Sequence, residues 1–178
     1  PPSKIFVLFI ASIELLFSLN TLADQEFKVV AENGVELNVS KDDFANRVQV
    51  TGPSVKLKNP TEIESYGFVA KVDSPGNKVG LTIQGYLFTY GEGNNFSDLT
   101  PIFRGGEPLK MSITGRTKIA CSWTCKYAYH FIIDMPMEKV RRYAEDGAVV
   151  MQFRSRDGTW KPTLTIPTDH FEAVSKHK

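Results

Sequence analysis

Turn-forming residue pairs recur along this chain at short intervals, and they restrict it to a fold built from short strands. Asn33-Gly34 and Asp157-Gly158 each separate two runs of alternating apolar residues. Such pairs are strong hairpin signals, because these residues adopt the positive φ that a tight turn requires. Further breaks fall at Gly52-Pro53, at Asn59-Pro60 and across residues 73–77.

Between these breaks, the chain is rich in β-branched and aromatic residues, which predicts strands. Gly85 lies inside one such run, and we interpret it as a β-bulge. No strand–helix–strand alternation of the parallel type is present. The predicted strands are residues 27–31, 35–39, 48–51, 54–58, 63–72, 79–90, 102–104, 111–120, 126–133, 148–154 and 159–166.

Three short helices are predicted from capping residues and helical spacing, at residues 40–47, 136–145 and 169–176. Ser40 and Asp169 can cap two of them, and Gly147 suits the C-terminal end of the middle one. We therefore expect a mainly β fold, an antiparallel β-sandwich-like (β-rich α+β) domain with two or three short helices.

The N-terminal segment has the order of a secretory signal peptide. Lys4 precedes an apolar run of 13 residues from Ile5 to Phe17, and a short polar stretch ends at Ala23. A membrane-spanning helix needs about 20 residues, so no permanent membrane anchor is expected. The alternative is a helix of the folded domain, and Glu14 counts toward it. We predict a signal peptide over residues 1–23, a single domain over residues 24–178, and a periplasmic or secreted protein of bacterial export.

The two cysteines, Cys121 and Cys125, can form a disulfide only across a turn. Residues four apart on a straight strand are about 13 Å apart, whereas bonded cysteines have Cα atoms within about 7 Å. Strand-like runs on both sides predict a hairpin whose three-residue loop, 122–124, is closed by the bond. Export favours that use of a cysteine pair. Redox activity is disfavoured because the spacing is not C-x-x-C.

Charge and motif content exclude several classes of function. The net charge is +1 and no basic stripe runs along the chain, so a nucleic-acid partner is not expected. Phosphate-binding, dinucleotide-binding, zinc-protease and serine-hydrolase motifs are all absent. We therefore predict no cofactor and no metal. A modest basic group is interpreted as solvated surface: Arg141, Arg142, Arg154, Arg156 and Lys161.

The three histidines offer a weak case for acid–base chemistry. His130 and Asp134 share one face of a predicted strand, but they stand about 13 Å apart along it. His170 and His177 share a face of the last predicted helix about 10 Å apart, too far to chelate one metal unaided. We interpret all three as ordinary structural residues.

Aromatic residues are the better candidates for contacts with a partner. Trp123 falls at the tip of the predicted disulfide hairpin, either folded back onto the hairpin or exposed as a binding residue. Tyr127, Tyr129, Phe131 and Ile133 alternate along one face and are interpreted as core. Tyr86, Phe88 and Tyr90 alternate on the strand 79–90, where they line a groove or pack beneath the following loop.

Together these patterns favour an exported, non-catalytic binding protein with an unidentified protein or glycan partner. Its predicted contact residues are Trp123, Tyr86 and Tyr90. One alternative is a small hydrolase assembled around His130, with Asp134 or Asp169. Another is a structural protein that assembles through an open sheet edge.

Overall fold

A computed structural model of the chain describes residues 25–58, 65–90, 99–156, 158 and 160–177. These residues form a mainly β structure with antiparallel sheets and two helices, as the turn pattern predicts. The strands are β1 (Gln25–Val30), β2 (Glu36–Asp42), β3 (Arg47–Thr51), β4 (Val55–Lys56), β5 (Tyr66–Ser74), β6 (Asn77–Tyr90), β7 (Thr100–Phe103), β8 (Met111–Cys121), β9 (Cys125–Asp134), β10 (Ala144–Glu145), β11 (Ala148–Arg154) and β12 (Thr163–Pro167). The helices are α1 (Met137–Tyr143) and α2 (Thr168–Lys176).

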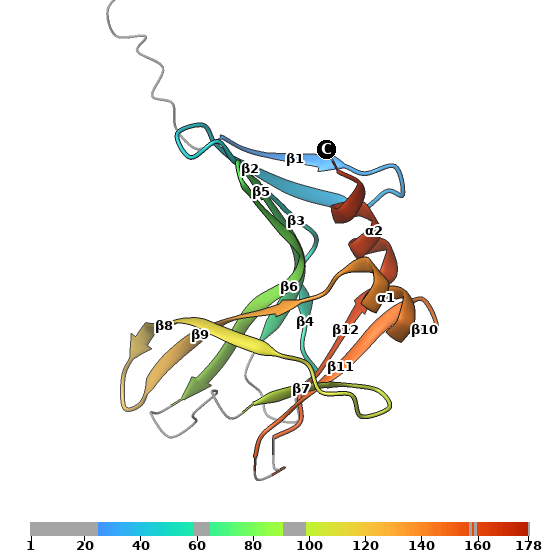
Figure 1. The fold of residues 1–178 in the computed structure, drawn as a ribbon. Coiled ribbons are helices and arrows are strands. Elements are labelled where there is room, and N and C mark those ends of the chain that lie inside the picture. The colour runs from blue at the N-terminus through green and yellow to red at the C-terminus, as the bar shows by residue number, and fades with distance from the viewer. Residues whose placement is uncertain (1–24, 59–64, 91–98, 157, 159, 178) are drawn as a thin grey trace, which may run out of the picture.

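The larger sheet has the strand order β1-β2-β3-β5-β6-β9-β8, with β4 also paired to β5. It bends sharply, so that β1, β2 and β3 form an upper arm and the β8–β9 hairpin forms a lower arm (Figure 1). A register shift occurs near the bend: Ala70 faces Thr82, but Val72 faces Val79, so β6 carries one extra residue. Such bulges increase twist and bend a strand.

The smaller sheet joins β10, β11 and β12, and β7 pairs with β11. This sheet and both helices lie on one side of the large sheet, opposite the concave side of its bend (Figure 1). The two sheets and α2 therefore enclose a common core, while the other face of the large sheet turns away from it.

The core is formed by alternate residues of the facing strands. Ile83 and Phe131 of the large sheet are fully buried, as are Phe153 of β11 and Phe171 of α2. The rings of Phe131 and Phe153 meet edge to face, with centroids 5.3 Å apart. The predicted core face of β9 is confirmed, since Tyr127, Phe131 and Ile133 are buried and Tyr129 is half-buried against the core.

The prediction of a helix at residues 40–47 is wrong. Residues 36–42 and 47–51 are instead the strands β2 and β3, joined by a turn. Asp42 accepts a hydrogen bond from the Ala45 N–H at 2.9 Å, and Asn46 has φ 46°. Ser40, which was predicted to cap the helix, lies in β2, and Asp42 and Asn46 stabilise a turn, which is the competing preference of Asp and Asn side chains.

Three local predictions are also corrected. Gly147 has φ 75° in the β10–β11 turn and does not cap α1, whose C-cap is Ala144. Asp169 lies inside α2, whose N-cap is Pro167, and its side chain makes no capping hydrogen bond.

Gly85 is the third correction, because it pairs in regular register with both Gly67 and Phe131 and forms no bulge. A Cβ at Gly85 would overlap the carbonyl oxygen of Tyr66 and lie 2.7 Å from Phe131 Cζ. Gly85 is therefore required for the close approach of strand and core.

Several predictions lie outside the described residues. They concern the segment 1–23, the turn at Asn59-Pro60 and the loop that follows Tyr90.

Candidate functional site

The candidate site is the face of the large sheet that turns away from the core. Cross-strand register places Tyr66 of β5 beside Tyr86 of β6, and Tyr86 beside His130 of β9. Phe88 follows Tyr86 on the same side of β6, since side chains alternate along a strand. We call these four residues the aromatic face; all four are half-buried.

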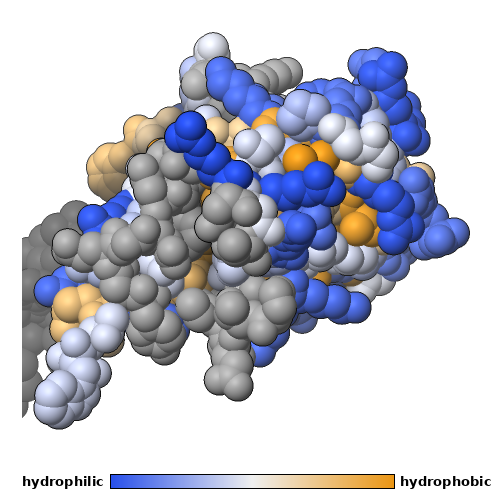
Figure 2. Space-filling model, turned by 90° about the horizontal axis from the view of Figure 1, so that it is seen from below, coloured by the Kyte–Doolittle hydropathy of each residue, from blue (hydrophilic) through white to orange (hydrophobic). Residues whose placement is uncertain are grey.

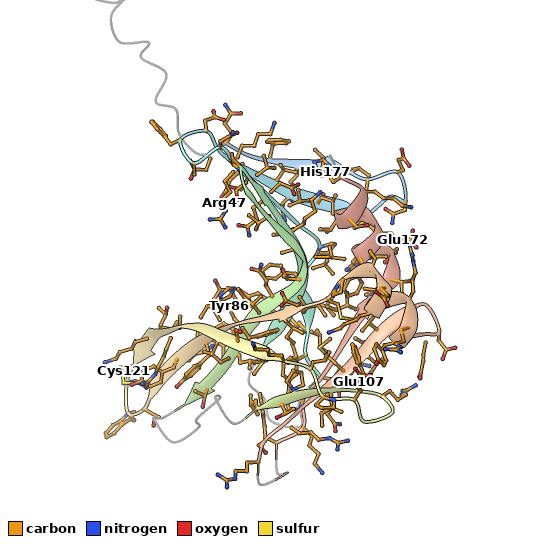
Figure 3. All side chains as sticks on the ribbon, in the orientation of Figure 1. Arg47, Tyr86, Glu107, Cys121, Glu172 and His177 are labelled. Atoms are coloured by element: carbon orange, nitrogen blue, oxygen red, sulfur yellow. A yellow bond between two sulfur atoms is a disulfide. The ribbon has the colours of Figure 1, made fainter. Side chains whose placement is uncertain are left out.

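The four rings form one contact group. The centroid of Tyr86 lies 5.6 Å from that of Tyr66, 6.4 Å from that of Phe88 and 5.1 Å from that of His130. These separations are typical of favourable aromatic pairs. Tyr86 lies on the concave side, between the upper and lower arms of the sheet (Figure 3).

Backbone and side-chain contacts hold this arrangement in place. The buried Ser65 hydroxyl accepts a hydrogen bond from the Phe88 N–H at 3.1 Å. The Lys126 amine lies 4.8 Å from the centroid of the Phe88 ring, a cation–π distance. The aromatic face thus has a cation at the border nearest to the lower arm.

Burial shifts the titration of two members of the aromatic face. The pKa of His130 is lowered because burial disfavours the imidazolium, which keeps the ring neutral at pH 7. The pKa of Tyr66 is raised by burial and by the neighbouring Tyr86, so its hydroxyl stays protonated. The aromatic face is therefore uncharged and can both donate and accept hydrogen bonds.

A hydrogen bond joins His130 Nδ1 to the Thr114 hydroxyl of β8. A hydroxyl beside a neutral imidazole is the first half of a nucleophile–base arrangement. A carboxylate that orients the base would complete this arrangement, but neither of the two predicted carboxylates lies beside His130. Asp134 faces Thr82, further along the sheet, and Asp169 belongs to α2 on the opposite side.

The upper arm continues the same face with polar side chains. Its register aligns Lys28 with Asn38, and Asn38 with Thr51. A shallow hollow of about 560 Å³ lies there, lined by Glu26, Phe27, Lys28, Asn38, Val39, Ser40, Gln49 and Thr51. The concave side therefore changes from polar in the upper arm to aromatic below the bend.

The end of the lower arm carries the second group of predicted residues. Cys121 and Cys125 are directly paired across β8 and β9, with Cα atoms 4.0 Å apart and the sulfurs 2.06 Å apart. This is the predicted three-residue loop closed by a cross-strand disulfide. Cys121 lies at the far end of the arm (Figure 3).

Trp123, in that loop, is 102% exposed, so it does not fold back onto its own hairpin. Seen from below, hydrophilic residues cover most of the described surface, and hydrophobic ones show only in small separate areas (Figure 2). Among the large hydrophobic side chains that the structure describes, Trp123 is the most exposed, ahead of Phe44 at 83%.

The structure thus separates the predicted contact residues into two places. Tyr86 belongs to the aromatic face and Trp123 to the far end of the lower arm, and the side chain of Tyr90 is outside the described parts. Tyr66 was not predicted as a contact residue, because the sequence of its strand does not show which residue of the neighbouring strand it faces. Only the register between β5 and β6 brings Tyr66 to Tyr86.

The described ranges contain neither a metal-binding cluster nor a membrane-spanning helix. No group of three His, Cys, Asp or Glu side chains there could hold a metal ion. Within the same ranges, neither helix has the length and hydropathy to cross a bilayer.

Comparison with known proteins gives no assignment. No protein family, no curated protein and no solved structure matches this chain.

Proposed function

We propose that this chain is an exported, non-catalytic binding protein that holds a protein or glycan partner on its aromatic face. The observation that carries the proposal is the clustering of Tyr66, Tyr86, Phe88 and His130 on the side of the large sheet opposite the core. A sheet face directed to solvent is normally polar, and tyrosine rings are favoured anchors of binding surfaces.

Export is supported by two features of different kinds. Residues 1–23 have the order of a signal peptide, and a cross-strand cysteine pair suits an oxidising compartment. The periplasm or the extracellular space is therefore the proposed location.

The proposal is tested by screening the purified protein against a glycan array and a displayed peptide library. Ligands found with the wild-type protein should bind Tyr86→Ala at least about tenfold more weakly, since the central ring of the cluster is removed. Phe44→Ala is the matched control, because Phe44 is an exposed aromatic residue of the upper arm, 83% exposed. Undiminished binding by Tyr86→Ala would contradict the proposal.

A hydrolase is the alternative proposal, and the hydrogen bond between Thr114 and His130 is the observation that favours it. It predicts that a panel of chromogenic esters is hydrolysed by the wild-type protein, and that His130→Ala abolishes the activity. It is less supported because neither carboxylate predicted for it lies beside His130.

Assembly through a sheet edge is less supported as well. The edge strand β8 is irregular at two places, between Ile113 and Gly115 and between Lys118 and Ala120, and it carries exposed cations. Bulges and charges on an edge strand are the usual means of preventing pairing with another chain.

A further inference from the structure

The end of the lower arm combines exposed apolar side chains with a fixed backbone. Trp123 is 102% exposed and Ile119 is 53% exposed. The Cys121–Cys125 bond closes the three-residue loop that carries Trp123. We call residues 118–126 the tip. Its apolar side chains contribute nothing to the core, so their role lies outside the folding of the domain.

From Lys110 to Ile133, every charged side chain of the arm is a cation. Between Glu107 and Asp134 the sequence has no acidic residue, but it has Lys110, Arg116, Lys118 and Lys126. The Arg116 guanidinium lies 3.9 Å from the centroid of the Tyr127 ring, which orients this charge along the arm. An arm with this charge attracts anionic surfaces.

Trp123 and the cationic residues follow one another along the hairpin axis. Lys126 faces Ala120, one pair behind the disulfide, and Lys118 faces Tyr127. At about 3.3 Å per residue, the backbone of Lys126 lies about 7 Å, and that of Lys118 about 13 Å, behind the loop that carries Trp123. Tryptophan favours the interfacial zone of a bilayer, and amines favour the phosphate level above it.

We propose that the tip inserts Trp123 into the interface of an anionic lipid bilayer, while Lys118 and Lys126 bind lipid phosphates. This contact surface meets the aromatic face only at Lys126, whose amine lies 4.8 Å from the centroid of the Phe88 ring, and it goes beyond the proposed function. Charge complementarity selects the anionic bilayer, and the tryptophan at the leading end distinguishes a bilayer from a soluble polyanion. The disulfide presents the loop ready for insertion, which lowers the entropic cost of binding.

The experiment is co-sedimentation of the full chain with vesicles of phosphatidylcholine, with and without phosphatidylglycerol. We expect binding only to the anionic vesicles, and we expect added salt to weaken it. Trp123→Ala should reduce partitioning by at least about tenfold. Each of Lys118→Ala and Lys126→Ala should reduce it by about fivefold.

Phe44→Ala is the matched control, because it removes an exposed aromatic residue from the other arm and should bind vesicles as the wild type does. Insertion is read separately from Trp123 fluorescence in a Trp160→Phe background, which leaves one tryptophan. We expect a blue shift and quenching by brominated lipid only with anionic vesicles.

Three results would overturn the proposal. They are no binding to anionic vesicles, full binding by Trp123→Ala, and binding without a blue shift. Tight binding to dextran sulfate together with the last result would identify a soluble polyanion as the partner. None of these results bears on Tyr86, so the proposed function is tested independently.

Discussion

The two arms of the large sheet each end in a turn with an exposed aromatic residue, yet the turns are built differently. Phe44, between β2 and β3, is 83% exposed, and Trp123, between β8 and β9, is 102% exposed. The upper turn is held by the hydrogen bond from the Ala45 N–H to Asp42 at 2.9 Å. The lower turn is held by a covalent bond.

Charge separates the two turns further. Phe44 follows Asp42 and Asp43 and lies between Lys41 and Arg47, so its surroundings have both signs. Trp123 lies in the stretch from Lys110 to Lys126, in which all charged residues are cations. Exposure of an aromatic ring is common enough that it indicates little alone. A fixed backbone and charge of one sign make the lower turn the better candidate for a contact surface.

The largest effect is expected where both arms meet the core, at Gly85. Gly85→Ala should lower the free energy of unfolding by about 3 kcal/mol or more, because the added Cβ would overlap the Tyr66 carbonyl oxygen and crowd Phe131. Urea unfolding measures the change. Hydrogen exchange should show that the upper and lower arms lose protection together, since they share one core.

Gly80→Ala is the control for this substitution, because a Cβ at Gly80 on the same strand meets nothing within 4 Å. It should leave the stability within about 1 kcal/mol of the wild type. Loss of protection in one arm alone in Gly85→Ala would show that the arms unfold as independent units.

The next effect is confined to the lower arm. Replacing both cysteines in Cys121→Ser/Cys125→Ser should destabilise the tip by about 2 kcal/mol, because the unfolded loop regains its freedom. Amide exchange over residues 116–126 should then be roughly thirtyfold faster. Exchange around Phe44 should not change, because the upper turn does not depend on the bond.

Asp42→Ala makes the reciprocal test in the upper arm. It removes the acceptor of the Ala45 N–H, which should cost about 1 kcal/mol there and leave the tip protected. If either variant loosened both turns, the turns would be coupled, and the contrast between them would be wrong.

The contrast between local and long-range information also explains what the sequence could predict. Turn pairs such as Asn33-Gly34 and the spacing of Cys121 and Cys125 act within a few residues, and they led to most strands and to the disulfide hairpin. The prediction for residues 40–47 was wrong because Ser40 was taken as a helix cap, whereas Asp42 and Asn46 stabilise a turn between two strands. A short-range pattern of this kind fits both a turn and a helix start, and only the pairing of the neighbouring strands decides between them.

The aromatic face depends on register, which no local pattern contains. Tyr66 and Tyr86 are far apart in the chain, and they meet because Gly67 and Gly85 form the adjacent cross-strand pair. Only Gly85 was singled out from the sequence, and it was interpreted as a bulge. The need for a glycine at position 85 becomes clear only when the structure places Phe131 and the Tyr66 carbonyl oxygen against it.

The smallest effect is expected from pH, through His130 at the base of the lower arm. Burial lowers the pKa of His130 in the folded protein, so folding favours the neutral imidazole. Its contribution to stability is therefore present above the unfolded pKa of about 6.5, and it is lost as the pH falls below that value. The wild-type melting temperature should decrease between neutral pH and about pH 5.

His130→Gln keeps a polar partner for Thr114 but does not titrate, so part of that decrease should disappear. His170→Gln is the control, because burial lowers the pKa of His170 as well. His170 lies on α2, and the neighbouring Asp169 partly offsets the effect of burial on its pKa. The protection factors of the β8 amides, which correct for the intrinsic pH dependence of exchange, should become independent of pH in His130→Gln and remain dependent on it in His170→Gln. An unchanged pH response of β8 in His130→Gln would show that the lower arm is anchored without His130, and that only the core at Gly85 and the disulfide distinguish it from the upper arm.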